Sequence, residues 1–208
     1  MPFKILAIRA TKGSNYLKNL QPHVLYRFTS SYHFDGNDDQ NGDFRNIKEI
    51  QDQSDYPAEL YDLVMANNRK LEIHITAVLG KNDSGKSSLL ELLYLMVYCL
   101  AEKKGYIHDR EFDQRQVDRG FNREYFEEYK EQVNLLLKES AIEVYYQLGN
   151  DFYVLVNDEK LQLYQLENKK WLRVGYQPDL FFYSIVVNYS LYGLNSFISA
   201  CAFNINVL

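Results

Sequence analysis

Residues Gly80 to Ser87 (GKNDSGKS) have the types and spacing that bind a phosphate chain. In this pattern, G-x-x-x-x-G-K-[ST], backbone N–H groups surround the β-phosphate, and the ammonium of Lys86 contacts the β- and γ-phosphate oxygens. The hydroxyl of Ser87 is the expected Mg²⁺ ligand, because this metal otherwise keeps water and phosphate oxygens. Ser88 is a further candidate, for an α-phosphate contact. The predicted nucleotide-binding residues are Gly80, Lys81, Asn82, Asp83, Ser84, Gly85, Lys86, Ser87 and Ser88.

The elements that must position this loop are a strand before it and a helix after it. Residues 71–79 (LEIHITAVL) alternate and then become apolar on both faces, which predicts a strand entering a covered sheet. Residues 87–101 (SSLLELLYLMVYCLA) are apolar nearly all round, which predicts a helix buried between layers and ending near Gly105. The partial positive charge at the start of such a helix attracts phosphate.

Further elements are predicted before and after the loop and its helix. Residues 3–10 and 24–34 each predict one strand ahead of the loop, whereas residues 58–66 suit either a short helix or a strand. Residues 35–55 hold seven carboxylates, and their spacing misses the calcium-loop pattern, so a solvated surface loop is expected rather than a metal site. Residues 122–139 have the period of an amphipathic helix.

From residue 141 the apolar period changes to two. Four short strands separated by polar turns predict an antiparallel meander, and residues 181–187 predict a buried strand. The segment YVLVNDE resembles a strand ending in a Walker B Asp-Glu pair. Asn157 stands where the last apolar residue should be, and Lys160 leads into another strand, so a hairpin turn is predicted there.

Composition limits the class of protein. The chain has 208 residues, of which 46% are hydrophobic and 25% charged, as expected for one globular domain. A net charge of −5 argues against a broad basic surface for nucleic acid. Cys99 and Cys201 lie in apolar runs without metal-type spacing, and no signal peptide precedes them, so a cytoplasmic protein is expected. Residues 180–208 lack charge over a length that could span a bilayer, yet their many amides and hydroxyls favour a buried strand and helix.

Residues 75–93 (ITAVLGKNDSGKSSLLELL) resemble the N-terminal nucleotide-binding lobe of ABC-type ATPases, in the branch of the SMC, RecF and OLD (overcoming-lysogenisation-defect) proteins. Most of that branch has glycine at the position of Asp83, and Asn-Asp is the variant associated with the OLD-like group. Asn and Asp tolerate left-handed backbone, so the substitution is compatible with the loop. The resemblance implies an α/β P-loop NTPase fold, with an antiparallel β-subdomain, a helical excursion, and ATP and Mg²⁺ as ligands.

The resemblance also divides the chain and suggests further site residues. It implies a single ATP-binding lobe with N-terminal strands and acidic loop over 1–70, phosphate-loop strand and helix over 71–105, charged helical excursion over 106–140, and meander with buried strand over 141–208. Asn188 could take the place of the family's polar residue that touches Mg²⁺ and the attacking water. Tyr26, Tyr32 and Tyr61 are candidates for stacking on adenine.

The sequence contains no convincing Walker B Asp-Glu, no L-S-x-G signature and no switch histidine. We therefore expect an incomplete site, in an N-terminal segment of a longer protein or in a chain completed by another. Three hypotheses follow. The first is an ATPase that dimerises head to tail on ATP and drives a DNA-linked or anti-phage defence process. The second is a nucleotide-gated module that regulates a partner effector such as a nuclease, with little turnover. The third is a phosphotransferase with an N-terminal extension; none involves a membrane.

Overall fold

The computed structural model describes part of the chain. The described residues are 3–12, 17, 19–37, 39–55, 57, 62–65, 70–71, 78, 85–103, 124, 127–128, 131, 135, 141–158 and 160–175, with the backbone alone at 71, 98, 102 and 103. Predictions for residues 106–123 and 176–208, which include the first half of the charged excursion, the buried strand and Asn188, fall outside this part.

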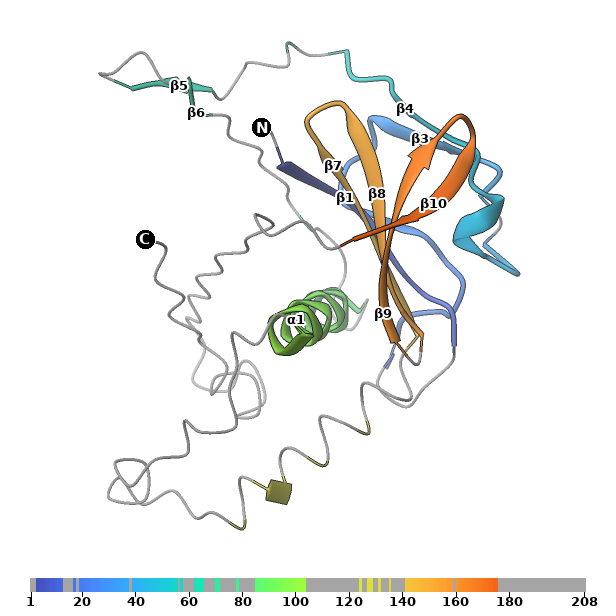
Figure 1. The fold of residues 1–208 in the computed structure, drawn as a ribbon, viewed down its shortest axis with the longest axis vertical. Helices are drawn as coiled ribbons and strands as arrows, with labels where there is room; N and C mark the ends of the chain where they lie inside the picture. The colour runs from blue at the N-terminus through green and yellow to red at the C-terminus, as the bar shows by residue number, and fades with distance from the viewer. Residues whose placement is uncertain are drawn as a thin grey trace.

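A six-stranded antiparallel sheet and one helix dominate the described residues (Figure 1). The elements are β1 (Phe3–Ala10), β2 (Tyr26–Arg27), β3 (Tyr32–Asp35), a 3₁₀ turn (Phe44–Asn46), β4 (Glu49–Asp52), β5 (Leu63–Val64), β6 (Lys70–Leu71), α1 (Lys86–Lys103), β7 (Ile142–Leu148), β8 (Asp151–Asp158), β9 (Lys160–Glu167) and β10 (Lys170–Val174). The main sheet has the order β10-β9-β8-β7-β1-β2, and β3-β4 and β5-β6 form two small sheets.

The long-range pairing is antiparallel throughout. β1 lies beside β7, with Phe3 opposite Leu148 and Ala10 opposite Ile142. The predicted first strand, the helix after the phosphate loop and the antiparallel meander β7–β10 are confirmed. The α/β P-loop fold stays a prediction, because most of its central strand, residues 72–77 and 79, lies outside the described part.

Two predictions upstream of the loop were wrong. The single strand expected over 24–34 is split into β2 and β3, because a turn held by a 2.8 Å hydroxyl contact between Thr29 and Ser31 separates them. Residues 35–55 are not simply a solvated loop. Their apolar residues Phe44, Ile47 and Ile50 recur at intervals of three and are buried, which folds the acidic segment onto the sheet.

The two faces of the sheet carry separate cores. Alternation along each strand sends successive side chains to opposite faces. On one face, α1 packs through Leu89, Leu92, Met96 and Leu100. The other face is covered by β3, β4 and residues 35–49, which we call the acidic strap.

The helix α1 is less enclosed than its sequence predicts, because Leu90 keeps 38% of its surface exposed. Among the described residues, no helix has the length and apolar character needed to cross a membrane.

Candidate functional site

The start of α1 is the described part of the predicted phosphate loop; residues 80–84 lie outside it. Gly85 is buried and has φ +88°, a left-handed backbone that favours glycine. Its carbonyl oxygen accepts a 2.9 Å hydrogen bond from the N–H of Leu89. A Cβ at Gly85 would lie 2.7 Å from Cδ2 of Leu20. The backbone conformation therefore favours glycine where the chain enters the helix, and a Cβ there would also require the end of the Leu20 side chain to move.

The three polar residues that follow differ in exposure. Ser87 is exposed, Lys86 is half-buried, and Ser88 is only 4% exposed. All three belong to the first turn of α1, whose N–H groups have no acceptor within the helix. Ser87 is thus the more accessible of the two serines, as its predicted role at Mg²⁺ requires, whereas Ser88 offers little side-chain surface to a nucleotide.

The segment between β1 and β2 lies against this helix start. Leu17, Leu20 and Ala10 share a core with Leu89. The N–H of Gln21 donates to the hydroxyl of Tyr26 over 2.7 Å. The end of β1, this segment and the first turn of α1 are therefore joined at one corner of the sheet.

The three tyrosines named for adenine stacking are separated by the fold. Tyr26 packs against the core of the α1 face, beside the segment that contacts Gly85. Tyr32 is on the opposite face, 1% exposed, with its hydroxyl donating to Oε1 of Gln147 over 2.6 Å. Tyr32 is therefore wrong as a stacking candidate, since no ring surface is available to a base. Tyr61 lies outside the described residues.

The hairpin prediction for residues 157–159 is confirmed. Asp158 pairs with Lys160 across the β8–β9 connection, and its Oδ1 forms a 2.5 Å ion pair with Nζ of Lys12. Both side chains of the ion pair are 53% exposed. Asp158 therefore ends a hairpin strand at the surface and does not have the place of a Walker B carboxylate.

The carboxylates of the acidic strap are engaged in local hydrogen bonds. Oδ1 of Asp39 accepts from the N–H of Leu25 at 3.0 Å and from Asn37 at 2.9 Å. The Leu25 N–H is the main cause that lowers the pKa of Asp39. Asp43 accepts from the backbone and side chain of Arg45. Among the described residues, no group of three His, Cys, Asp or Glu side chains is placed to hold a metal ion.

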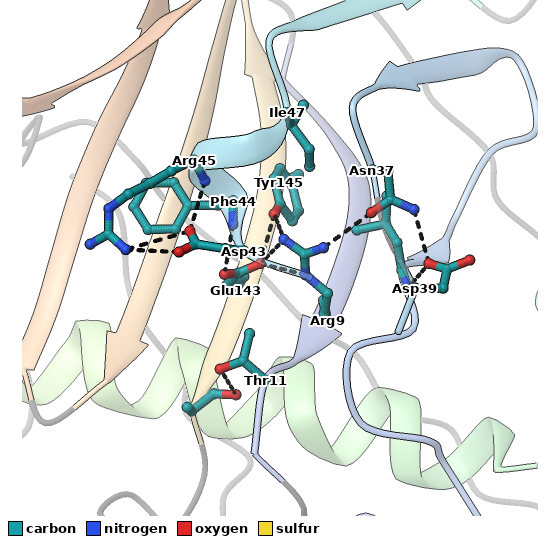
Figure 2. Close-up of polar contacts among 12 residues, drawn as sticks. Arg9, Thr11, Asn37, Asp39, Asp43, Phe44, Arg45, Ile47, Glu143 and Tyr145 are labelled. Carbon is teal, nitrogen blue, oxygen red and sulfur yellow. Dashed lines mark hydrogen bonds and ion pairs between the residues drawn. The ribbon is translucent and has the colours of Figure 1, made fainter. Parts of the chain in front are cut away.

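A buried polar network on the strap face was missed by sequence reasoning (Figure 2). Arg9, fully buried on β1, donates through Nε to Oε2 of Glu143 at 2.7 Å and through Nη2 to the hydroxyl of Tyr145 at 2.7 Å. The Tyr145 hydroxyl donates in turn to Oε2 of Glu143 at 2.6 Å. The signals in the sequence are Arg9 and Glu143, each a charged residue within a mostly apolar strand.

The network also holds the acidic strap. Nη1 of Arg9 donates to Oδ1 of Asn37 at 3.0 Å, and the N–H of Phe44 donates to Oε1 of Glu143 at 3.3 Å (Figure 2). Burial raises the pKa of Glu143, since desolvation outweighs the stabilising effect of Arg9 and the hydrogen bonds. It also raises the pKa of Tyr145. The network is closed to solvent, so it fastens strap to sheet rather than offering a site to a substrate.

Comparison with models of protein families, with characterised proteins and with solved structures found no match to this chain. The resemblance noted for residues 75–93 therefore depends on those residues alone.

Proposed function

We propose that this protein binds ATP with Mg²⁺ through residues 80–88. The observation that carries the proposal is the complete phosphate-binding pattern, G-x-x-x-x-G-K-S. Its support from the described residues is local: a left-handed Gly85 leads directly into an 18-residue helix whose first residues are Lys86 and Ser87. A loop that turns at glycine into a helix N-terminus is the arrangement that directs N–H groups and a lysine at phosphate oxygens.

Calorimetric titration with ATP and Mg²⁺ tests this assignment in the full chain. Lys86→Ala should weaken binding on the order of 100-fold, because charge-assisted hydrogen bonds to phosphate contribute up to about 3 kcal/mol. Lys48→Ala is the matched control, since Lys48 is an exposed lysine of the acidic strap, on the other face of the sheet. Equal affinity of the two variants for ATP would contradict the site.

The larger function we propose is that of an N-terminal part of an SMC/RecF/OLD-like ATPase. In this proposal ATP joins two subunits head to tail, and residues outside this chain complete the hydrolytic site and couple it to a DNA-linked or anti-phage defence process. The support is the resemblance of residues 75–93. Size-exclusion chromatography with and without ATP tests it: ATP should produce a dimer, and an unchanged monomer at saturating ATP would count against it.

A second candidate is a nucleotide-gated module that regulates a partner effector and turns over little ATP itself. The observation in its favour is that Asp158 lies in a surface hairpin and pairs with Lys12, so it is not in place to organise an attacking water. Phosphate release from ATP by the isolated chain measures whether the chain hydrolyses ATP without other residues, which neither candidate predicts. We expect negligible turnover; a rate within the ordinary enzymatic range of about 1 s⁻¹ or more would refute both.

A further inference from the structure

β10 is the last strand of the main sheet, and it leaves one backbone edge without a partner among the described residues. It joins β9 through Asn168 and Lys169, whose φ values of 48° and 62° are those of a two-residue type I′ hairpin. In such a hairpin the pair next to the turn, Glu167 and Lys170, exchanges hydrogen bonds, and alternate residues along the strand point their backbone groups away. Trp171 and Arg173 therefore direct N–H and C=O groups toward the open edge.

Positive charge gathers along this edge. Lys170 and Arg173 are exposed, and neither forms an ion pair with any described residue. Lys169 is 70% exposed and lies 3.4 Å from Oε2 of Glu49.

The acidic strap brings two more cations close to β10. Its carbonyl oxygen at Ile47 accepts a 2.8 Å hydrogen bond from Nε1 of Trp171. Arg45, 66% exposed, stands over the ring of Phe44, which contacts Trp171 edge to face. Nζ of Lys48 donates to the carbonyl oxygen of Arg45. Five cations thus lie around the edge, namely Arg45, Lys48, Lys169, Lys170 and Arg173. They outnumber the three carboxylates there, those of Asp43, Glu49 and Glu167, although the chain has a net charge of −5.

One apolar side chain is also presented there. Leu172 is 46% exposed, although its neighbours in the strand, Trp171 and Val174, are half-buried in the two cores. By alternation, Leu172 and Lys170 share the α1 face of the strand, whereas Arg173 is on the strap face. The edge therefore offers cations on both faces and an apolar contact between them.

We propose that the open edge of β10, with these cations and Leu172, is a docking site for an extended acidic segment of another protein, which adds to the sheet as a further strand. Backbone hydrogen bonds to Trp171 and Arg173 supply the pairing, and carboxylates on the face of Arg173, with apolar side chains on the face of Leu172, supply specificity. A second β10 is a poor occupant, because lysine and arginine at an edge oppose pairing with themselves. Nucleic acid matches the charge but not the regular alternation of donors and acceptors.

Fluorescence anisotropy with a labelled ten-residue peptide of alternating glutamate and valine tests the proposal in the full chain, without nucleotide. The central comparison is between Arg173→Gln, which removes charge alone, and Arg173→Pro, which also removes an outward N–H and is compatible with an edge strand. Arg173→Gln should weaken binding about two- to fivefold, as for an exposed charge pair. Arg173→Pro should weaken it about fivefold further, as for one lost hydrogen bond. Lys160→Gln, an exposed cation at the other hairpin, should leave affinity unchanged.

Several outcomes would overturn strand addition. Equal affinity of Arg173→Gln and Arg173→Pro, both verified as folded by circular dichroism, would show that the backbone edge is not used. If Arg173→Pro does not fold, the same question is answered with a peptide N-methylated at alternate residues: full binding by that peptide refutes the proposal, and loss supports it. Equal binding of a lysine-for-glutamate peptide, or binding of a ten-residue oligothymidylate in place of the acidic peptide, would also refute it. Because these measurements omit ATP, their outcome is separate from that of the nucleotide site.

Discussion

Tyr145 and Tyr146 are consecutive on β7 and lie on opposite faces of the sheet, and their hydroxyl groups differ in hydrogen bonding. On the strap face, Tyr145 accepts a hydrogen bond from Arg9 and donates one to Glu143. On the α1 face, Tyr146 stacks on Tyr153 with ring centroids 5.3 Å apart, and its buried hydroxyl has no hydrogen-bond partner among the described residues.

The difference shows how each face is held together. The strap is an irregular segment, so its backbone groups cannot all pair within a sheet, and buried side chains supply directional partners. The helix satisfies its own backbone and needs only apolar contacts, which are non-directional. Directional hydrogen bonds thus hold the strap to the face away from the predicted nucleotide site. Apolar packing holds the helix to the face beside that site.

The largest effect expected from this comparison is at Glu143. Glu143→Ala should lower the free energy of unfolding by about 3–5 kcal/mol, because Arg9 would remain buried without its counter-charge. Urea denaturation measures the change. Glu49→Ala, which breaks the exposed pair with Lys169, is the control and should cost no more than about 1 kcal/mol. Similar losses in the two variants would show that the buried pair is not what holds the strap.

A smaller effect separates the two tyrosines. Tyr145→Phe should destabilise by about 1–3 kcal/mol, because it leaves buried charged groups short of a hydrogen bond. Tyr146→Phe should be neutral or stabilise by up to about 1 kcal/mol, since it removes a buried hydroxyl that has no hydrogen-bond partner in the described part of the chain. The same chemical change thus has opposite expected signs at adjacent positions. Equal destabilisation in thermal or urea unfolding would contradict the contrast between the faces.

The smallest of the three effects is at the entry to α1. Gly85→Ala should cost about 1–2 kcal/mol, because a left-handed backbone strains any residue with a Cβ. The added Cβ also meets the end of the Leu20 side chain, so the double variant with Leu20→Ala separates crowding from strain. If the substitution is tolerated without loss of stability, the left-handed entry into the helix is not required on this face.

Sequence patterns predicted the regular elements well and the irregular segment poorly. The two-residue period after residue 141 and the apolar run after Ser87 correspond to β7–β10 and α1, because both signals are local. The acidic strap was interpreted from its carboxylates, although Phe44 and Ile47 anchor it. Nothing local reveals that these two residues are buried, since the surface that covers them comes from β1 and from strands more than ninety residues later in the chain.

By itself, the sequence determined a phosphate-binding pattern, an antiparallel meander and an apolar helix, all of which are written in short-range spacing of residue types. Only the tertiary structure decided that Tyr32 is buried while Tyr26 shares a face with α1, that Asp158 pairs with Lys12, and that Arg9 meets Glu143 across 134 residues. These facts depend on register and on which face each strand turns to its neighbours. A shift of one residue would exchange the faces, and the pairing of β1 with β7, which are far apart in the chain, is not fixed by a local turn.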